Sequence, residues 1–271
     1  MPNNSLFLVD TYDTLKGVKK AVEIGKWLRE SGHEMLGIRL DSGDLAYLSI
    51  ESRKILDEGG FKDAVIVASN DLDEYLITTL KEQGAKITVW GVGTKLVTAY
   101  DQPALGGVYK LSAVQGKLAP QPPKGGALKA AWEYKVKLSE QTIKVSNPGI
   151  QRVKRFIDKD GIFMGDMIYD EIFGIEENMI IDPKDSTRRK KFPKNSKSVD
   201  LLTPIFKDGE LVYKSPSLLE IKSKVETQLK SLHAGVKRFH NPHEYPVGLE
   251  EKLFNVKMEL IMQARGVKNE K

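Results

Sequence analysis

Short apolar runs and helical patterns alternate four times in the N-terminal part of the chain. The apolar runs occupy residues 5–9, 35–40, 64–68 and 86–90. Between them, apolar residues recur at the spacing that places them on one face of a helix. A continuously apolar run is typical of a parallel strand that is covered on both faces. The pattern therefore predicts four consecutive strand–helix units.

This repeat predicts an α/β fold of the (β/α) barrel kind, in which parallel strands close on themselves. Four units are half of the usual eight, so a half barrel would leave open strand edges. We expect either that the later chain completes the closure or that residues preceding Met1 are missing.

The pattern changes after Thr94, where alternating and turn-rich segments replace the strand–helix repeat. The segment 115–130 is rich in Pro and Gly and predicts a loop. Around it the sequence predicts strands and hairpins over residues 106–114, 134–138, 153–157, 161–168 and 201–214. The C-terminus returns to helical spacing over residues 217–232 and 250–264. We predict a partial barrel in 1–111, an accessory antiparallel β region in 112–214 and a C-terminal helical segment in 215–271.

Composition places the chain among ordinary globular proteins, with 40% apolar and 29% charged residues in 271. Its apolar runs are shorter than the roughly 18 residues of a membrane span, so we expect no membrane partner. The chain contains 0 cysteines, which excludes disulfides and thiolate metal sites and fits a reducing compartment. Its start lacks the basic and apolar regions of a secretory signal. We therefore expect a cytoplasmic location.

The net charge of +5 suits nucleic acid, acidic membranes or small anionic substrates. The densest basic run is Arg188-Arg189-Lys190-Lys191, within a polar stretch. No aromatic residues alternate with it, as they would in a groove for single-stranded nucleic acid. We interpret the run as a solvated loop and expect no nucleic-acid partner.

One stretch concentrates chemistry where the second predicted strand meets its helix. It contains Arg39, Asp41, Ser42, Gly43 and Asp44. A single Ser or Asp would suffice as a helix cap, so capping alone does not account for the whole group. Ligands of α/β proteins bind at such strand-to-helix loops. The stretch therefore predicts a binding site, with capping as the alternative.

Three further loops end the other predicted strands and would lie at the same, carboxyl, edge of a parallel sheet. They are residues 10–13, which carry Asp10 and Asp13, the triplet Ser69-Asn70-Asp71, and Gly91-Val92-Gly93-Thr94. Gly91, Gly93 and Thr94 could form a nest of N–H groups for a phosphate, or simply a strand-to-helix turn. No G-x-x-x-x-G-K-[ST] motif is present, which argues against a P-loop nucleotidase.

The same edge would carry six carboxylates, which repel one another unless a cation balances them. They are Asp10, Asp13, Asp41, Asp44, Asp71 and Asp73. Arg39, Mg²⁺ or both could supply the positive charge, because hard oxygen ligands favour Mg²⁺ over zinc. We predict Asp10 and Asp41 as the Mg²⁺ ligands. His240 and His243 lie close together, but a turn is a commoner reason for such a pair than a metal.

The loop motifs, in this order and spacing, resemble the second half of nicotinate phosphoribosyltransferases. The motifs are Leu8-Val9-Asp10-Thr11-Tyr12-Asp13-Thr14, Arg39-Leu40-Asp41-Ser42-Gly43-Asp44-Leu45, Ala68-Ser69-Asn70-Asp71-Leu72, Trp90-Gly91-Val92-Gly93-Thr94, Leu105-Gly106-Gly107-Val108-Tyr109-Lys110-Leu111 and Asn241-Pro242-His243-Glu244-Tyr245-Pro246-Val247-Gly248. The resemblance implies ATP-assisted phosphoribosyl transfer from phosphoribosyl pyrophosphate to nicotinate, the first step of NAD salvage, giving nicotinate mononucleotide and pyrophosphate. It also implies the incomplete barrel of type II phosphoribosyltransferases, with an accessory β region and a homodimeric assembly.

Carried over by position, Arg39 would face the pyridine carboxylate and the ribose-phosphate side. Asp41 and Asp10 would hold ribose hydroxyls or Mg²⁺, and these three residues are the predicted catalytic group. The predicted substrate- and phosphate-binding residues are Ser42, Gly43, Ser69, Asn70, Asp71, Gly91, Gly93 and Thr94.

The chain also departs from the family pattern. In the family, an earlier domain carries the histidine that ATP phosphorylates and an aromatic residue that stacks on nicotinate. Nothing before Leu6 could supply them, and Gln151 stands where the family tends to be basic. We therefore expect a C-terminal portion that pairs with a missing N-terminal part and forms no product alone. The alternative is a non-catalytic module for phosphorylated ligands or for oligomerisation.

Overall fold

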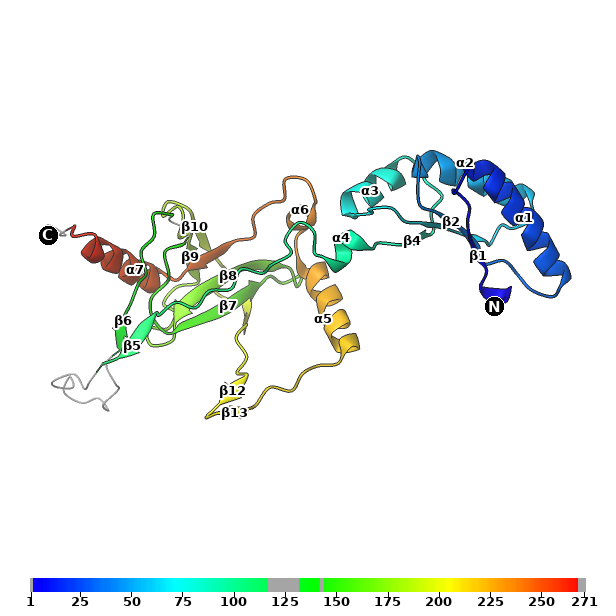
Figure 1. The fold of residues 1–271 in the computed structure, drawn as a ribbon. Helices are drawn as coiled ribbons and strands as arrows, with labels where there is room; N and C mark the ends of the chain where they lie inside the picture. Colours follow the sequence, from blue (N-terminus) through cyan, green and yellow to red (C-terminus); the bar gives the residue numbers. More distant parts are fainter. Residues whose placement is uncertain (1, 117–131, 142–143, 268–271) are drawn as a thin grey trace. The chain divides into compact units, whose positions relative to one another are not determined.

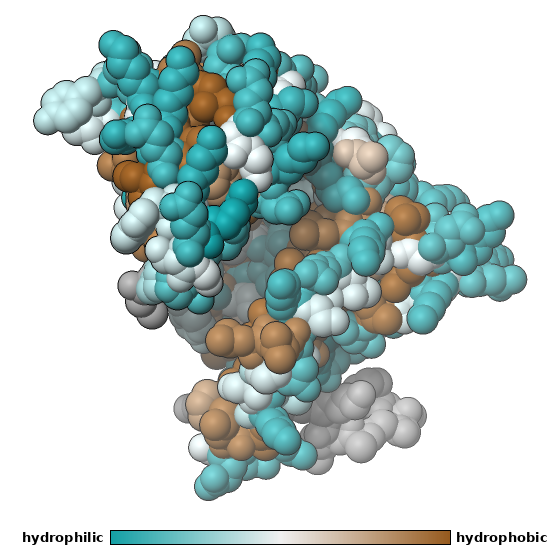
Figure 2. Space-filling model, turned by 90° about the vertical axis from the view of Figure 1, so that its right-hand side faces the viewer, coloured by the Kyte–Doolittle hydropathy of each residue, from teal (hydrophilic) through white to brown (hydrophobic). Residues whose placement is uncertain are grey.

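The computed structural model describes residues 2–116, 132–141 and 144–267. These residues form two compact units, divided between Gly107 and Val108 (Figure 1). No helix in the described part of the chain is long and apolar enough to cross a membrane. On the side drawn in Figure 2, hydrophobic side chains reach the surface between hydrophilic ones.

The first unit confirms the four strand–helix repeats. Four parallel strands pair in chain order, with a short 3₁₀ turn before them and helices after each strand. The strands are β1 (Leu6–Leu8), β2 (Gly37–Leu40), β3 (Val65–Ala68) and β4 (Val89–Trp90). The helices are α1 (Thr14–Glu30), α2 (Leu45–Glu58), α3 (Glu74–Glu82) and the short α4 (Thr94–Val97). The strands form an open sheet, and the described residues do not close a barrel.

The expectation that both faces of each strand are covered is wrong for this unit. Alternate side chains of a strand point to opposite faces, and α1, α2 and α3 lie on one face (Figure 1). Ile38 and Ile66 are fully buried in the core under these helices. The opposite row pairs Leu8, Arg39, Val67 and Val89 across the four strands. This row is open: Leu8 is 52% and Val89 42% exposed.

The second unit contains a six-stranded sheet in the order β10-β9-β14-β8-β7-β11. Its strands are β7 (Gln151–Ile157), β8 (Phe163–Asp170), β9 (Met179–Ile181), β10 (Arg189–Lys191), β11 (Lys197–Asp200) and β14 (Val247–Leu249). β14 is parallel to β8 and antiparallel to β9. The sheet therefore joins the predicted β region to a strand from the predicted C-terminal helical segment.

Two apolar clusters stabilise this sheet. The last helix, α7 (Glu251–Ala264), buries Leu253 and Phe254 against Ile181 and Leu249. A second cluster contains Phe156 and Phe192, whose rings stack with their centroids 4.2 Å apart. The predicted helix over 250–264 is therefore confirmed, and its apolar face covers the sheet.

The other elements described in the second unit are two short strand pairs and two helices. They are β5 (Ala113–Gln115) with β6 (Trp132–Tyr134), β12 (Phe206–Lys207) with β13 (Glu210–Leu211), α5 (Leu218–Ser231) and α6 (Ala234–Lys237). The helix predicted over 217–232 is confirmed as α5, which begins after the capping residue Ser217. Most of the predicted loop 115–130 lies outside the described residues.

Two strand-level predictions need correction. Of the strand predicted over 106–114, only Ala113 and Val114 pair in a sheet, because the glycine-rich part before them forms no ladder. The basic run is not simply a loop, since Arg189–Lys191 pairs with β9 as the edge strand β10. Its side chains are exposed, as an edge strand of charged residues should be.

Candidate functional site

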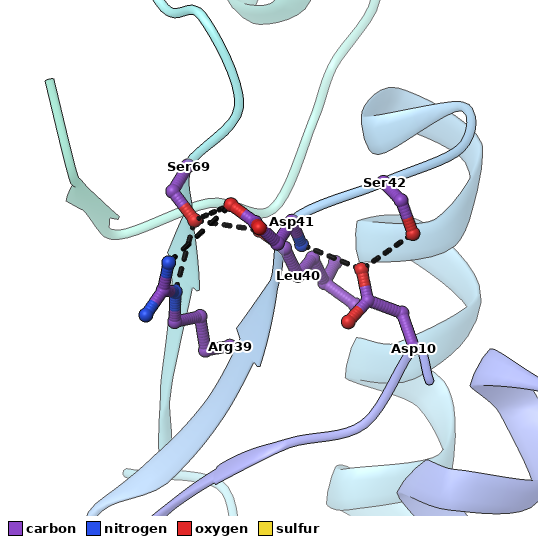
Figure 3. A network of polar contacts seen from close by, with 6 residues as sticks. All are labelled: Asp10, Arg39, Leu40, Asp41, Ser42 and Ser69. Carbon is purple, nitrogen blue, oxygen red and sulfur yellow. Dashed lines mark hydrogen bonds and ion pairs between the residues drawn. The ribbon is translucent and has the colours of Figure 1, made fainter. Parts of the chain in front are cut away.

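Hydrogen bonds join the loops at the carboxyl ends of β1, β2 and β3 (Figure 3). Oδ2 of Asp10, after β1, accepts the backbone N–H of Asp41 at 2.7 Å and the hydroxyl of Ser42 at 2.7 Å. Oδ1 of Asp41, after β2, accepts the hydroxyl of Ser69, which follows β3. Three loops far apart in sequence are thus locked together by side chains that the sequence predicted as a site.

Arg39 stands on the open face of the sheet, in the row with Leu8 and Val67. Its Nε–H donates to the hydroxyl oxygen of Ser69 at 2.9 Å, and its Nη2 lies 3.4 Å from Oδ1 of Asp41. Figure 3 shows the guanidinium group lying beside Ser69 at the end of β3. The bonds hold one edge of the guanidinium and leave its other N–H groups for an anion.

The charge state of Asp41 follows from these contacts. The hydrogen bond from Ser69 and then the adjacent guanidinium of Arg39 hold the pKa of the Asp41 carboxyl below its usual value. Asp41 is therefore a carboxylate at neutral pH. A fixed cation and a fixed anion lie side by side at the loop edge, a pattern suited to a ligand that carries both a carboxylate and hydroxyl groups.

Three of the six predicted carboxylates have a structural role. Asp13, Asp44 and Asp73 cap α1, α2 and α3 by accepting a backbone N–H three residues further along the chain, at 3.0, 3.1 and 2.7 Å. Asp73 also accepts the ammonium group of Lys95 at 2.7 Å. The expected repulsion is reduced because the positive ends of the helix dipoles partly offset these three charges. For Asp44, the alternative of a helix cap is confirmed, whereas Asp41 and Ser42 belong to the loop network.

The backbone accounts for three more predicted site residues. Gly43 has a φ of +78°, which L side chains rarely adopt. Asn70 and Asp71 have φ values of 86° and 47°, in the left-handed region that costs energy for residues with a side chain. Asn70 and Asp71 are exposed. The strained turn places Asn70 and Asp71 directly after Ser69. That these two residues contact a ligand stays a prediction.

The fourth loop approaches the network through its first glycine. The N–H of Gly91 donates to the carbonyl of Ala68 at 2.7 Å, and a Cβ on Gly91 would lie 3.4 Å from the Cβ of Ser69. No atom of the described residues lies within 4 Å of the place that a Cβ on Gly93 would take. This leaves room for a ligand near Gly93 and Thr94, whose phosphate-binding role stays a prediction.

The donor set can be tested for its fit to Mg²⁺. Within the part of the chain that the structure describes, the network uses Oδ2 of Asp10 and Oδ1 of Asp41, so the second oxygen of each carboxylate is left for another contact. No group of three or more metal-ligating side chains was found among the described residues. Mg²⁺ commonly binds through one or two carboxylates together with waters and substrate phosphates, so the pair is adequate for that mode.

Sequence reasoning missed an ionic network around the buried Asp166 in the second unit. Arg155 on β7 donates to both carboxylate oxygens of Asp166 on β8, at 2.8 and 2.7 Å. The hydroxyl of Tyr245 donates to the same carboxylate at 2.9 Å, and burial raises the pKa of Tyr245. Arg155 lies four residues after Gln151, the position where this sequence differs from the family pattern. Its pairing with Asp166 depends on the register between β7 and β8, which no local sequence motif reveals.

Comparisons with known proteins agree with the motifs. Residues 150–257 match the family model described as the nicotinate phosphoribosyltransferase C-terminal domain. A nicotinate phosphoribosyltransferase of Bacillus subtilis (strain 168) is 43% identical over 268 residues, which are 96% of this chain and 51% of the relative. One from Caenorhabditis elegans is 36% identical over 93% of this chain and 44% of the relative.

A solved structure gives the same result. The crystal structure of human nicotinic acid phosphoribosyltransferase superposes with a TM-score of 0.70 at 25% identity, over 96% of this chain and 47% of that chain. The resemblance predicted from the loop motifs is thus confirmed. The chain spans about half the length of the curated relatives it matches.

Proposed function

From this similarity we propose that the chain is a portion of a nicotinate phosphoribosyltransferase and binds the phosphoribosyl and nicotinate groups at the β1–β4 loops. The reaction would transfer phosphoribose from phosphoribosyl pyrophosphate to nicotinate with the help of ATP. The observation that carries the proposal is the bonding of Asp10, Arg39, Asp41 and Ser69 into one network at a single sheet edge. A cytoplasmic location and a dimeric assembly belong to the same proposal.

Arg39 would recognise the carboxylate of nicotinate. A planar guanidinium donates two parallel N–H groups to a carboxylate and loses this match with the neutral amide of nicotinamide. Leu8 and Val67 flank Arg39 on the open face and would contact the flat ring. An apolar surface next to one oriented cation is the combination that an aromatic carboxylate requires.

Asp41 and Asp10 would act on the sugar. Their free carboxylate oxygens would accept ribose hydroxyls or ligate Mg²⁺, which when bound supplies positive charge to the leaving pyrophosphate. Because Asp41 is ionised, it would also favour the oxocarbenium-like charge that develops at the anomeric carbon. Gly91, Gly93 and Thr94 would bind the 5′-phosphate.

The ATP-assisted step would need a further group. Among the described residues of the first unit the one histidine is His33, which follows α1 and contacts Oδ1 of Asn3 at 2.9 Å. It precedes β2, whereas the loop site follows the strands. A phosphoryl-accepting histidine would therefore come from outside the first unit.

Calorimetry of the chain with two mononucleotides tests the binding proposal. We expect nicotinate mononucleotide to bind more tightly than nicotinamide mononucleotide, and Arg39→Ala to weaken the first by about 2–4 kcal/mol. Lys26→Ala, at an exposed position of α1, is the matched control and should leave affinity unchanged. Equal affinity for the two nucleotides, or no effect of Arg39→Ala, would refute the role of Arg39.

A turnover assay separates the enzyme portion from a non-catalytic module. We expect the chain alone to form no nicotinate mononucleotide from nicotinate, phosphoribosyl pyrophosphate, ATP and Mg²⁺. Product formation near the rates of ordinary enzymes, about 1 s⁻¹, would show that the chain needs no missing part. If addition of the N-terminal part of such an enzyme gives turnover, the chain is the C-terminal portion of a catalyst. If it gives none, the result favours the non-catalytic module.

A further inference from the structure

The second unit contains a pocket of about 570 Å³ that the loop site does not use. It lies between the β9–β10 hairpin and residues 243–247. Its apolar lining includes Ile180, Pro246 and Val247. This volume falls within the range of sites for small molecules, roughly 300–1,000 Å³.

Basic side chains dominate the charge of this pocket. Lys184, Arg188, Arg189 and Lys190 line it, against the two acids Asp182 and Glu244. Two of the cations have close carboxylates, since Lys184 pairs with Glu244 at 2.7 Å and Arg189 with Glu251 at 3.1 Å. The other two, Arg188 and Lys190, are the cations that a ligand could still engage.

Lys190 has no carboxylate within 4.0 Å in the described part of the chain. Lys190 as a whole is exposed, but its Nζ donates to the carbonyl of Met164 at 2.7 Å, and partial desolvation of the ammonium group lowers its pKa. A partly desolvated cation without an opposite charge gains from an added anion. Arg188 is only loosely held, with Nη1 3.6 Å from Asp182 and its side chain 64% exposed.

We propose that this pocket binds a small organic phosphate in which the phosphate is attached to an apolar ring. Arg188 and Lys190 would contact the phosphate, since a guanidinium and an ammonium group together satisfy several of its oxygens. The ring would lie on Ile180, Pro246 and Val247, where burial of apolar surface favours binding. An inorganic anion would use only the cations, and a neutral ring only the apolar lining.

Amide-resolved NMR with phenyl phosphate, inorganic phosphate and benzyl alcohol tests this proposal on the full 271-residue chain. Shifts at Thr187 and Val247 report the pocket, and shifts at Gly91 and Gly93 report the loop site separately. We expect phenyl phosphate to shift the pocket amides with a Kd about tenfold lower than that of either other probe. Unmoved pocket amides, or equal binding of inorganic phosphate, would overturn the proposal.

Two variants test the named cations. Lys190→Met and the exposed Arg188→Gln should each weaken phenyl phosphate about tenfold at the pocket amides. Lys197→Met, on β11 and outside the pocket lining, should bind as the unaltered chain does. Because Arg188 is exposed, its variant keeps the fold even if Lys190→Met does not. Unchanged affinity in Arg188→Gln would contradict the assignment.

Discussion

The Nε–H of Arg39 donates to the hydroxyl oxygen of Ser69 at 2.9 Å, and the same hydroxyl donates to Oδ1 of Asp41. One serine on the loop after β3 thus orients both a cation and a carboxylate of β2 and its loop. The pairing of β2 with β3 sets this geometry, because Leu40 lies opposite Ala68, one residue before Ser69. Ser69 is therefore a positioning residue as well as a predicted ligand contact.

Removal of the Ser69 hydroxyl should change the ionisation of Asp41 and the orientation of Arg39. In Ser69→Ala the pKa of Asp41 should rise toward its usual value, because the largest cause of its lowering is lost. Binding of nicotinate mononucleotide should weaken about tenfold, since Arg39 loses its orienting contact. Carboxyl NMR titration and calorimetry measure the two effects. Ser223→Ala, exposed on α5, is the control; an unchanged Asp41 pKa in Ser69→Ala would exclude the positioning role.

Replacing two aspartates by asparagine should separate the loop network from helix capping. Asp44→Asn should leave ligand binding and stability nearly unchanged, because asparagine caps a helix as well as aspartate. Asp10→Asn keeps an acceptor for Asp41 and Ser42 but removes the charge. It should abolish the effect of Mg²⁺ on the affinity for phosphoribosyl pyrophosphate, measured by calorimetry with and without Mg²⁺. If Mg²⁺ changed the affinity for phosphoribosyl pyrophosphate equally in the two variants, Asp10 would hold no metal.

Much of this site could be predicted because its information is local. Each apolar run with its following helix pattern is a short-range signal, and parallel strands must place their following loops at one edge. Asp10, Arg39, Asp41 and Ser69 could thus be brought together before any coordinates were known. The division of the acids into caps and network could not be predicted, because it depends on the donor that each carboxylate meets. Asp41 accepts the hydroxyl of Ser69, whereas Asp44 accepts the backbone N–H of Tyr47.

Long-range pairing accounts for the rest of what the sequence did not reveal. β14 has only three residues, Val247–Leu249, which is too short for a period-2 pattern, and it pairs with β8 from far earlier in the chain. The basic run gave no strand signal because its strand lies at a sheet edge, where no face needs an apolar side chain. The open face of the first sheet was also hidden, since exposed Leu8 is as apolar as buried Ile38.

Acid should destabilise the first unit through its paired aspartates. Hydrogen bonds lower the pKa values of Asp13, Asp41 and Asp73 below their ordinary value of 3.8. Groups with lowered pKa values stabilise the fold fully above the unfolded value and lose this contribution as the pH falls through the folded value. The free energy of urea unfolding should therefore be steady from pH 5 to 7 and decrease below about pH 4.

Asp73→Asn identifies one contributor to this acid effect. The variant keeps a capping side chain for α3 but loses the charge that pairs with Lys95. The difference in unfolding free energy between the unaltered chain and the variant should be largest near neutral pH and shrink toward pH 3. A difference that stays constant with pH would assign the effect of Asp73 to packing instead of charge.

Two arginines on β7 offer a matched comparison of buried and exposed ion pairs. Arg155 and Asp166 have side chains that are 19% and 10% exposed, whereas Arg152 and Glu171 are 44% and 51% exposed. Arg155→Ala leaves Asp166 as a buried charge beside Tyr245 and should cost about 3–5 kcal/mol of stability. Arg152→Ala should cost less than about 1 kcal/mol, because water replaces the lost contact. Urea unfolding followed at the amide signals of β8 measures both; similar costs for the two variants would mean that the Arg155 pair is not effectively buried.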